Sequence, residues 1–198
     1  MIGAYKASIV SFILPIVTCL IALYIPDINP VFTYISAFML ILNIVVFLVM
    51  LSIFKKRRRQ NAARLLIIFN TLTAFLFFTF PLLKVLIGYN WLQAILVVFF
   101  FICILLSIYD QKSETPIVFP DKGKRRRFDY LFYVIPVVVC LLGGGGSIIA
   151  SRIMTDIFGD ALTSIWGSSI LYILGCWLAF VTNSIFYQGF AKNGVWIK

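Results

Sequence analysis

The stretch of sequence that decides the fold is residues 31–59, which read VFTYISAFMLILNIVVFLVMLSIFKKRRR. Val31–Phe54 contains no charged residue, and five basic residues follow it at once. A helix needs about 20 apolar residues to cross the hydrocarbon core of a bilayer, and basic residues gather on the cytoplasmic side. The stretch therefore predicts a transmembrane helix that ends at the cytoplasmic surface.

Similar apolar segments recur along the whole chain, which is 62% hydrophobic and only 12% charged. That composition argues against a soluble globular protein, in which about 25% of all residues are charged on average. The segments are apolar on all sides, which favours helices over barrel strands. We predict an all-α polytopic membrane bundle, one integral membrane domain over residues 1–198, with six transmembrane helices in three hairpins. The expected spans are Ala7–Ile25, Val31–Phe54, Leu65–Gly88, Trp91–Tyr109, Tyr130–Ser151 and Ser164–Tyr187.

The chain carries a net charge of +10, and its basic residues are concentrated in short runs between the spans. With six spans, the two main runs and both termini fall on one side, which the positive-inside rule places in the cytoplasm. Juxtamembrane basic runs attract anionic lipid headgroups, so we expect lipid contacts there and no nucleic-acid binding. A cell membrane is expected, and specifically a bacterial plasma membrane. The basic residues assigned to lipid contact are Lys55, Lys56, Arg57, Arg58, Arg59, Lys124, Arg125, Arg126 and Arg127.

Catalytic and metal chemistry have little support in this sequence. It contains no histidine, which removes the commonest general base and metal ligand. Its seven acidic residues all lie outside the expected spans. The four cysteines lie inside spans and form no C-x-x-C motif. We therefore expect no enzyme activity, no catalytic residue, no cofactor and no metal site.

Small residues form the least ordinary pattern, because four consecutive glycines interrupt the fifth expected span. Small residues at four-residue spacing let membrane helices approach closely. This pattern predicts close packing of spans five and six, or of span five on a partner protein. The alternative is a broken helix whose freed backbone groups bind a solute. The residues of the expected packing or partner face are Gly143, Gly146, Ser147, Ala150, Ser151, Gly175 and Ala179.

Polar side chains inside the spans are few. Lys84 is the single ionisable residue there, and its nearness to the end of its span favours a side chain that extends to the outer headgroups. Asparagine and glutamine can hydrogen-bond between helices. Helix packing is the expected role, and the alternative is a solute or polar site. That site would contain Lys84, Asn43, Asn70, Gln93 and Asn183.

The outer connection 152–163 has a helical charge pattern. Arg152, Asp156 and Asp160 recur every four residues, and apolar residues fill the opposite face. This spacing predicts an amphipathic helix at the outer surface, which Gly159 would weaken. We expect either a structural extension of span five or a contact surface for an outside partner.

The sequence favours a non-enzymatic membrane protein that acts through protein–protein contacts. It would be an accessory subunit of a membrane complex or an immunity protein that binds a toxin, with a membrane partner or self-association. The alternative is a small-solute transporter or substrate-binding membrane subunit. A transporter needs a polar cavity that reaches the middle of the membrane, whereas a partner protein needs a dry interior and an exposed contact face.

Overall fold

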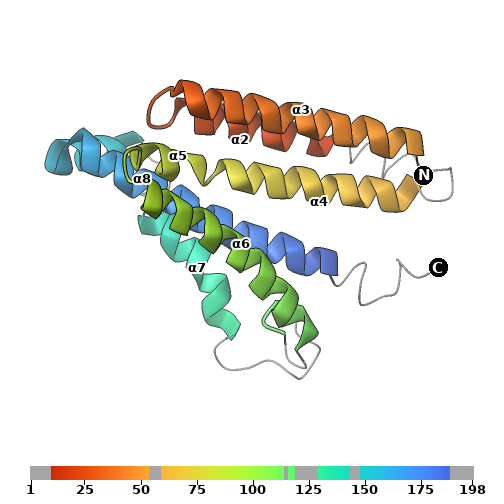
Figure 1. The fold of residues 1–198 in the computed structure, drawn as a ribbon. Coiled ribbons are helices and arrows are strands. Elements are labelled where there is room, and N and C mark those ends of the chain that lie inside the picture. The colour runs from red at the N-terminus through yellow and green to blue at the C-terminus, as the bar shows by residue number, and fades with distance from the viewer. Residues whose placement is uncertain (1–9, 54–58, 114–115, 119–128, 143–147, 188–198) are drawn as a thin grey trace.

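A computed structural model describes residues 10–53, 59–113, 116–118, 129–142 and 148–187 of the chain. Apart from turns and bends, the described residues are helical, because long apolar segments leave their backbone groups no partners other than one another. The helices form an elongated bundle (Figure 1). They are α2 (Ile13–Tyr24), α3 (Pro30–Ile53), α4 (Arg59–Phe77), α5 (Phe80–Val85), α6 (Asn90–Lys112), α7 (Asp129–Leu142) and α8 (Ile148–Phe186).

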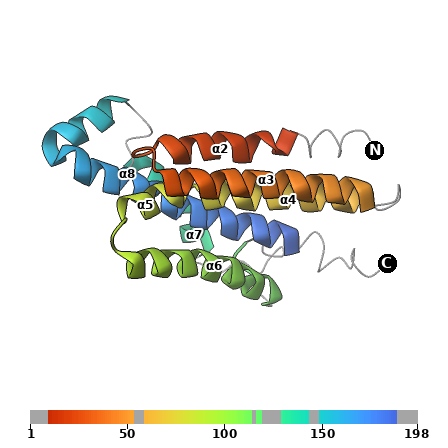
Figure 2. The same ribbon diagram turned by 45° about the horizontal axis from the view of Figure 1, so that its top comes forward.

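Helices α2 and α3 form a hairpin whose turn contains Asn29 and Pro30. The side-chain Oδ1 of Asn29 accepts hydrogen bonds from the backbone N–H groups of Val31 (3.0 Å) and Phe32 (3.4 Å). Asn29 therefore caps the start of α3, and Pro30 occupies the first helical position, where its missing N–H costs nothing. α2, α3 and α4 lie side by side (Figure 2).

The third expected span is broken into two helices, α4 and α5. Pro81 has no N–H, and its ring would collide with the carbonyl of Phe77 in a continuous helix. The chain turns at this point, and the backbone N–H of Thr79 bonds to the carbonyl of Leu76 at 2.9 Å. The Thr79 hydroxyl donates to the same carbonyl at 2.7 Å. The break shortens α4 and allows α5 to lean toward α8.

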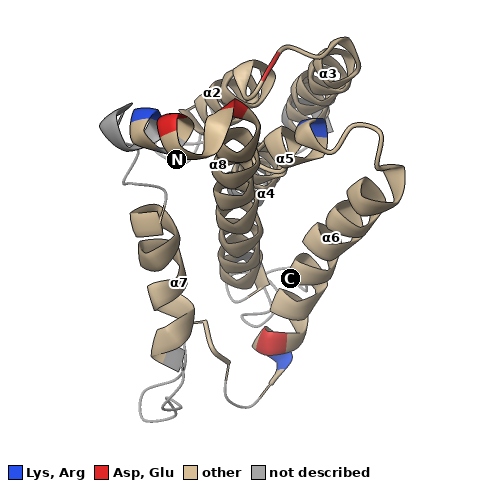
Figure 3. Ribbon diagram, turned by 90° about the vertical axis from the view of Figure 1, so that its left-hand side faces the viewer, with Lys and Arg blue, Asp and Glu red and all other residues tan. Residues whose placement is uncertain are grey.

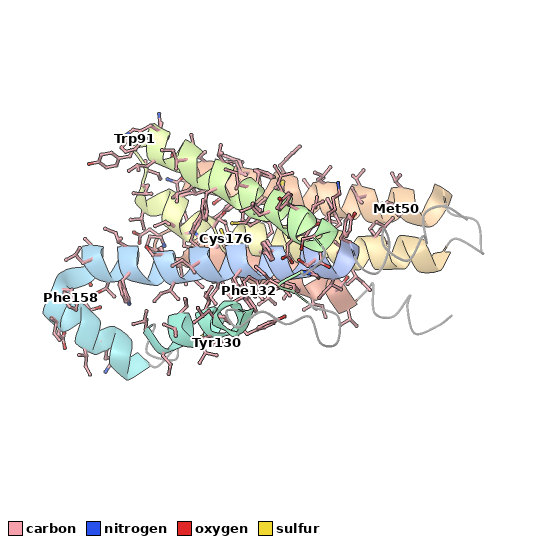
Figure 4. All side chains as sticks on the ribbon, turned by 90° about the horizontal axis from the view of Figure 1, so that it is seen from below. Met50, Trp91, Tyr130, Phe132, Phe158 and Cys176 are labelled. Atoms are coloured by element: carbon pink, nitrogen blue, oxygen red, sulfur yellow. The ribbon has the colours of Figure 1, made fainter. Side chains whose placement is uncertain are left out.

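Helix α8 consists of two helical segments that meet at a kink. It extends from Ile148 to Phe186 and bends at Gly159, which has φ 78° and ψ 166°. Only glycine adopts such angles readily. The chain therefore turns back at Gly159, with helix on both sides of the bend. Figure 4 shows this bend beside the labelled Phe158. The expected connection 152–163 is therefore part of α8, and the fifth expected span is divided between α7 and the start of α8.

The part of α8 after the bend is the centre of the bundle. It packs on α4, α5, α6 and α7, and Figure 3 shows α6 and α7 on opposite sides of it. The core around it contains Phe75 of α4, Phe100 of α6, and Tyr172 and Cys176 of α8. α7 is attached through Phe132, whose carbonyl accepts a 3.0 Å hydrogen bond from the Trp177 indole.

Polar side chains are inside this bundle and large apolar ones are outside. Asn43 is fully buried, whereas Tyr34 on the same helix is 76% exposed. That arrangement is expected in a lipid bilayer, where polar groups need partners inside the protein, and not in water. Four stretches are long and apolar enough to cross a membrane, and α2 and residues 130–142 of α7 are shorter apolar helices. The fold is that of a helical membrane protein. The four stretches are Pro30–Met50, Leu65–Val85, Asn90–Lys112 and Thr155–Ile185.

Candidate functional site

The bundle has two ends, which we call the Lys84 end and the Asp110 end. At the Lys84 end, α2 ends, α3 and α6 begin, and α8 bends (Figure 1). At the Asp110 end, α3, α6 and α8 end and α4 begins (Figure 1). The residues of the polar site that the sequence predicts fall into separate groups between these ends.

Asn43 and Asn70 hold the α2–α3–α4 unit together. The Asn43 amide donates to the carbonyl of Met39 at 2.7 Å and to the hydroxyl of Thr73 at 3.4 Å. The Asn70 amide donates to the hydroxyl of Ser11 at 3.0 Å. The side-chain oxygens of both asparagines have no hydrogen-bond partner among the residues that the structure describes. Each amide donor thus serves contacts within or between neighbouring helices.

Gln93 and Asn183 lie elsewhere and bond to different helices. The Gln93 amide donates to the carbonyl of Leu83 at 2.7 Å, which ties α6 to α5. The Asn183 amide donates to the Ser107 hydroxyl and, at 3.1 Å, to the carbonyl of Ile104. These bonds tie α8 to α6. The structure therefore does not bring the four predicted amides together into one polar site.

The small residues of α8 meet α4 at its break. A Cβ added to Gly175 would lie 2.9 Å from the backbone oxygen of Phe75 and 3.0 Å from the Cβ of Phe78. Ala179, one turn further, is fully buried. At Gly175, α8 therefore packs on α4, and α7, which belongs to expected span five, also contacts α8.

Several predicted positions lie outside the described residues. They are Gly143, Gly146 and Ser147 of the packing face, and Lys55, Lys56, Arg57, Arg58, Lys124, Arg125, Arg126 and Arg127 of the basic runs. Ala150 and Ser151 lie in α8 and Arg59 begins α4, but their side chains are likewise outside the described part.

Lys84 is buried inside the bundle and does not extend to the surface as expected. Its side chain is 6% exposed. The ammonium donates to the backbone carbonyl of Leu23 at 2.8 Å and to that of Asp27 at 2.7 Å. The last carbonyls of a helix lack partners inside the helix and carry partial negative charge, so they attract a cation. Lys84 thus caps the end of α2 and joins α5 to the α2–α3 turn.

A cavity of about 540 Å³ lies beside this ammonium. We call it the Lys84 cavity. Its walls come from the α2–α3 turn, from α5 and the residues just after it, and from α8 immediately after the bend. Acidic and basic positions gather at this end of the molecule (Figure 3). The polar residues that line the cavity are Asp27, Asn29, Lys84, Asp160 and Ser164.

The bend at Gly159 decides which charged residues reach the cavity. Arg152 and Asp156 precede the bend, whereas Asp160 follows it and lines the cavity. The predicted single charged face is therefore divided, because an amphipathic stripe needs uninterrupted helical angles. Asp27 and Asp160 are both exposed at the cavity, and neither carboxylate accepts a hydrogen bond from another described residue.

A buried carboxylate that the sequence pattern did not reveal lies at the other end. Asp110 is 8% exposed. Its two oxygens accept hydrogen bonds from the backbone N–H groups of Ile117 (2.8 Å) and Val118 (3.3 Å). Gln111 donates to Asp110 at 3.0 Å and to the carbonyl of Val118 at 2.9 Å. The only sequence signal for this cluster was an acidic residue in the last turn of an apolar helix, shortly before Pro116. The cluster holds the following chain against α6.

Metal chemistry finds no support in the described residues, where no three His, Cys, Asp or Glu side chains are grouped for a metal ion. The four cysteines are free thiols. The chain matches no protein-family model, no curated protein and no solved structure. The Lys84 cavity is therefore the candidate site on geometry alone.

Proposed function

We propose that this chain is a non-enzymatic multi-pass membrane protein that acts through protein–protein contacts in the membrane. It would be an accessory subunit of a membrane complex or a toxin-immunity protein. The supporting observation is the separation of polar and apolar groups in the bundle. The amide donors of Asn43, Asn70 and Asn183 are used for contacts between or within helices, and large apolar side chains cover the outside.

The proposed topology has six spans, with both termini in the cytoplasm of a bacterial cell. The basic runs Lys55–Arg59 and Lys124–Arg127 follow α3 and α6 in the sequence, and both helices finish at the Asp110 end. The positive-inside rule therefore assigns the Asp110 end to the cytoplasm. The runs would contact anionic lipid headgroups there.

The partner face is proposed to include α7. This helix packs mainly on α8, and Leu141 near its end is 72% exposed. The glycine run Gly143–Gly146, which favours close helix approach, follows directly in the sequence. A partner helix would thus contact the large apolar residues that α7 exposes.

A pull-down from gently solubilised membranes tests this proposal with a matched pair of variants. Leu141→Trp adds bulk to the proposed face, and Leu48→Trp adds the same bulk to α3, where Leu48 is 58% exposed. We expect the wild type and Leu48→Trp to retain one stoichiometric protein partner and Leu141→Trp to lose it. Equal recovery of partner by both variants would remove α7 from the contact, and recovery of no partner by any protein would contradict the proposal.

The second candidate is a small-solute transporter or substrate-binding membrane subunit, and the Lys84 cavity is the observation that favours it. A volume of about 540 Å³ lies in the range of small-molecule sites, which is about 300–1,000 Å³. Because the cavity is at one end of the bundle, it suits the binding of a solute better than its passage.

A further inference from the structure

The described acceptors of the Lys84 ammonium account for two of its three hydrogens. An ammonium carries three N–H donors and no acceptor. Two of them bond to the carbonyls of Leu23 and Asp27. No third acceptor among the described residues takes the remaining hydrogen, and Lys84 borders the cavity. An anionic group in the cavity can accept this hydrogen from a side chain that is only 6% exposed.

Two carboxylates supply the opposite charge from two different elements. Asp27 belongs to the α2–α3 turn, and Asp160 follows the bend in α8. With Lys84, the formal charge of the cavity is −2 + 1 = −1, although the whole chain has a net charge of +10. The cavity is therefore an acidic position on a basic protein, with one buried cation in its wall.

We propose that the Lys84 cavity binds a small zwitterion, which carries an ammonium group together with a phosphate or a carboxylate. The anionic group accepts the free hydrogen of Lys84, and the ammonium group is held by Asp27 and Asp160. A ligand with only negative charge would be repelled by the two carboxylates, and one with only positive charge would leave the remaining Lys84 hydrogen without an acceptor. Ile87 and Ile165 line the same cavity and provide apolar contact for the carbon skeleton.

Two sources offer this chemistry. One is the headgroup of phosphatidylethanolamine in the adjacent leaflet, and the other is a soluble zwitterion such as an α-amino acid. Exposed aromatic residues, which favour the headgroup layer, lie at the same end of the bundle: Tyr24 ends α2, and Trp91 near the start of α6 is labelled in Figure 4. The cavity is thus accessible to headgroups and to water. The zwitterion site is independent of the partner contacts on α7.

Thermal unfolding of the purified full-length chain tests the charge requirement. The probes are glycerophosphoethanolamine and glycine as zwitterions, with glycerol 3-phosphate and ethanolamine as single-charge controls. We expect at least one zwitterion to raise Tm and each single-charge compound to have a smaller effect at equal concentration. A rise as large with glycerol 3-phosphate or ethanolamine, or no rise with any probe and no retained phosphatidylethanolamine, would overturn the proposal.

Asp160→Asn is the informative variant because the side chain is exposed and its carboxylate accepts no hydrogen bond from another described residue. The fold should therefore survive the substitution. We expect it to weaken zwitterion binding by about tenfold, as for the loss of one charge-assisted hydrogen bond. Asp156→Asn is the matched control, since Asp156 is also exposed on α8 but does not line the cavity. Equal binding by Asp160→Asn and wild type would contradict the assignment.

Native mass spectrometry distinguishes the two sources. The protein is extracted from vesicles that contain equal amounts of phosphatidylethanolamine and phosphatidylcholine, whose quaternary ammonium has no N–H to donate. Phosphatidylethanolamine retained by wild type and Asp156→Asn, but not by Asp160→Asn, identifies a headgroup. A rise in Tm with glycine and no retained lipid identifies a soluble zwitterion. Either result is scored separately from partner recovery, so failure of one proposal leaves the other standing.

Discussion

The ammonium of Lys84 lies 2.8 Å from the backbone carbonyl oxygen of Leu23, a residue 61 positions earlier in the chain. This contact connects α5 to the end of α2, and the bond to Asp27 extends it to the following turn. The α4–α5 break brings the lysine to this position, because Pro81 ends α4 and begins the short helix that carries Lys84. One charged side chain therefore stabilises the end of a helix and borders the candidate site.

Replacement of Lys84 should weaken the fold. Lys84→Met keeps most of the length of the side chain but leaves the carbonyls of Leu23 and Asp27 without their donor. We expect the free energy of unfolding to fall by about 2 kcal/mol, a typical value for hydrogen bonds to a charged group. The measurement is an SDS titration in mixed micelles. Lys112→Met, at an exposed position at the end of α6, is the control and should change stability little. Equal stability of both variants would mean that the Lys84 contacts contribute nothing.

Gly175 should be intolerant of any side chain. A Cβ there would lie 2.9 Å from the backbone oxygen of Phe75, and backbone cannot move aside easily. We expect Gly175→Ala to lower the free energy of unfolding by about 1–3 kcal/mol through overpacking. Gly167→Ala is the matched variant on the same helix, because nothing lies within 4 Å of its Cβ position. It should leave stability unchanged or raise it by up to about 1 kcal/mol, the helix preference of alanine over glycine. The reverse order of the two variants would show that α8 does not approach α4 at Gly175.

Asp110 should control the order of the chain that follows α6. In Asp110→Ala, the backbone N–H groups of Ile117 and Val118 lose their acceptor. We expect the amide hydrogens of these two residues to exchange at least about tenfold faster, because a hydrogen bond to a charged group contributes about 1.5–3 kcal/mol. Hydrogen–deuterium exchange of the variant checks this, with Asp156→Ala as the control. Unchanged exchange at both amides would exclude the proposed capping role.

Local sequence patterns predicted the helices where the signals themselves were local. Val31–Phe54 corresponds to α3 (Pro30–Ile53), and the local cause of its start is the Asn29 cap. The division of expected span three into α4 and α5 also has a local cause, the missing N–H and the ring of Pro81. In each case the cause lies within four residues of the effect.

Features that depend on distant contacts could not be predicted in this way. The acceptors of Lys84 lie 57 and 61 residues earlier in the chain, and no spacing rule connects such positions. The expected charged face of 152–163 failed at one residue, since helical periodicity does not show that Gly159 adopts a positive φ. The predicted amides also did not converge, because Gln93 and Asn183 bond to backbone carbonyls of different helices.

The central claim, that the chain works through a membrane protein partner, is tested most directly by native mass spectrometry. The protein is purified gently in native lipid, and the mass of the intact particle is measured. The account predicts a stoichiometric particle heavier than the 22.5 kDa chain, with the additional mass assigned to a protein or to a second copy of this chain. A particle that contains a single chain, with or without a bound small molecule, would contradict the claim.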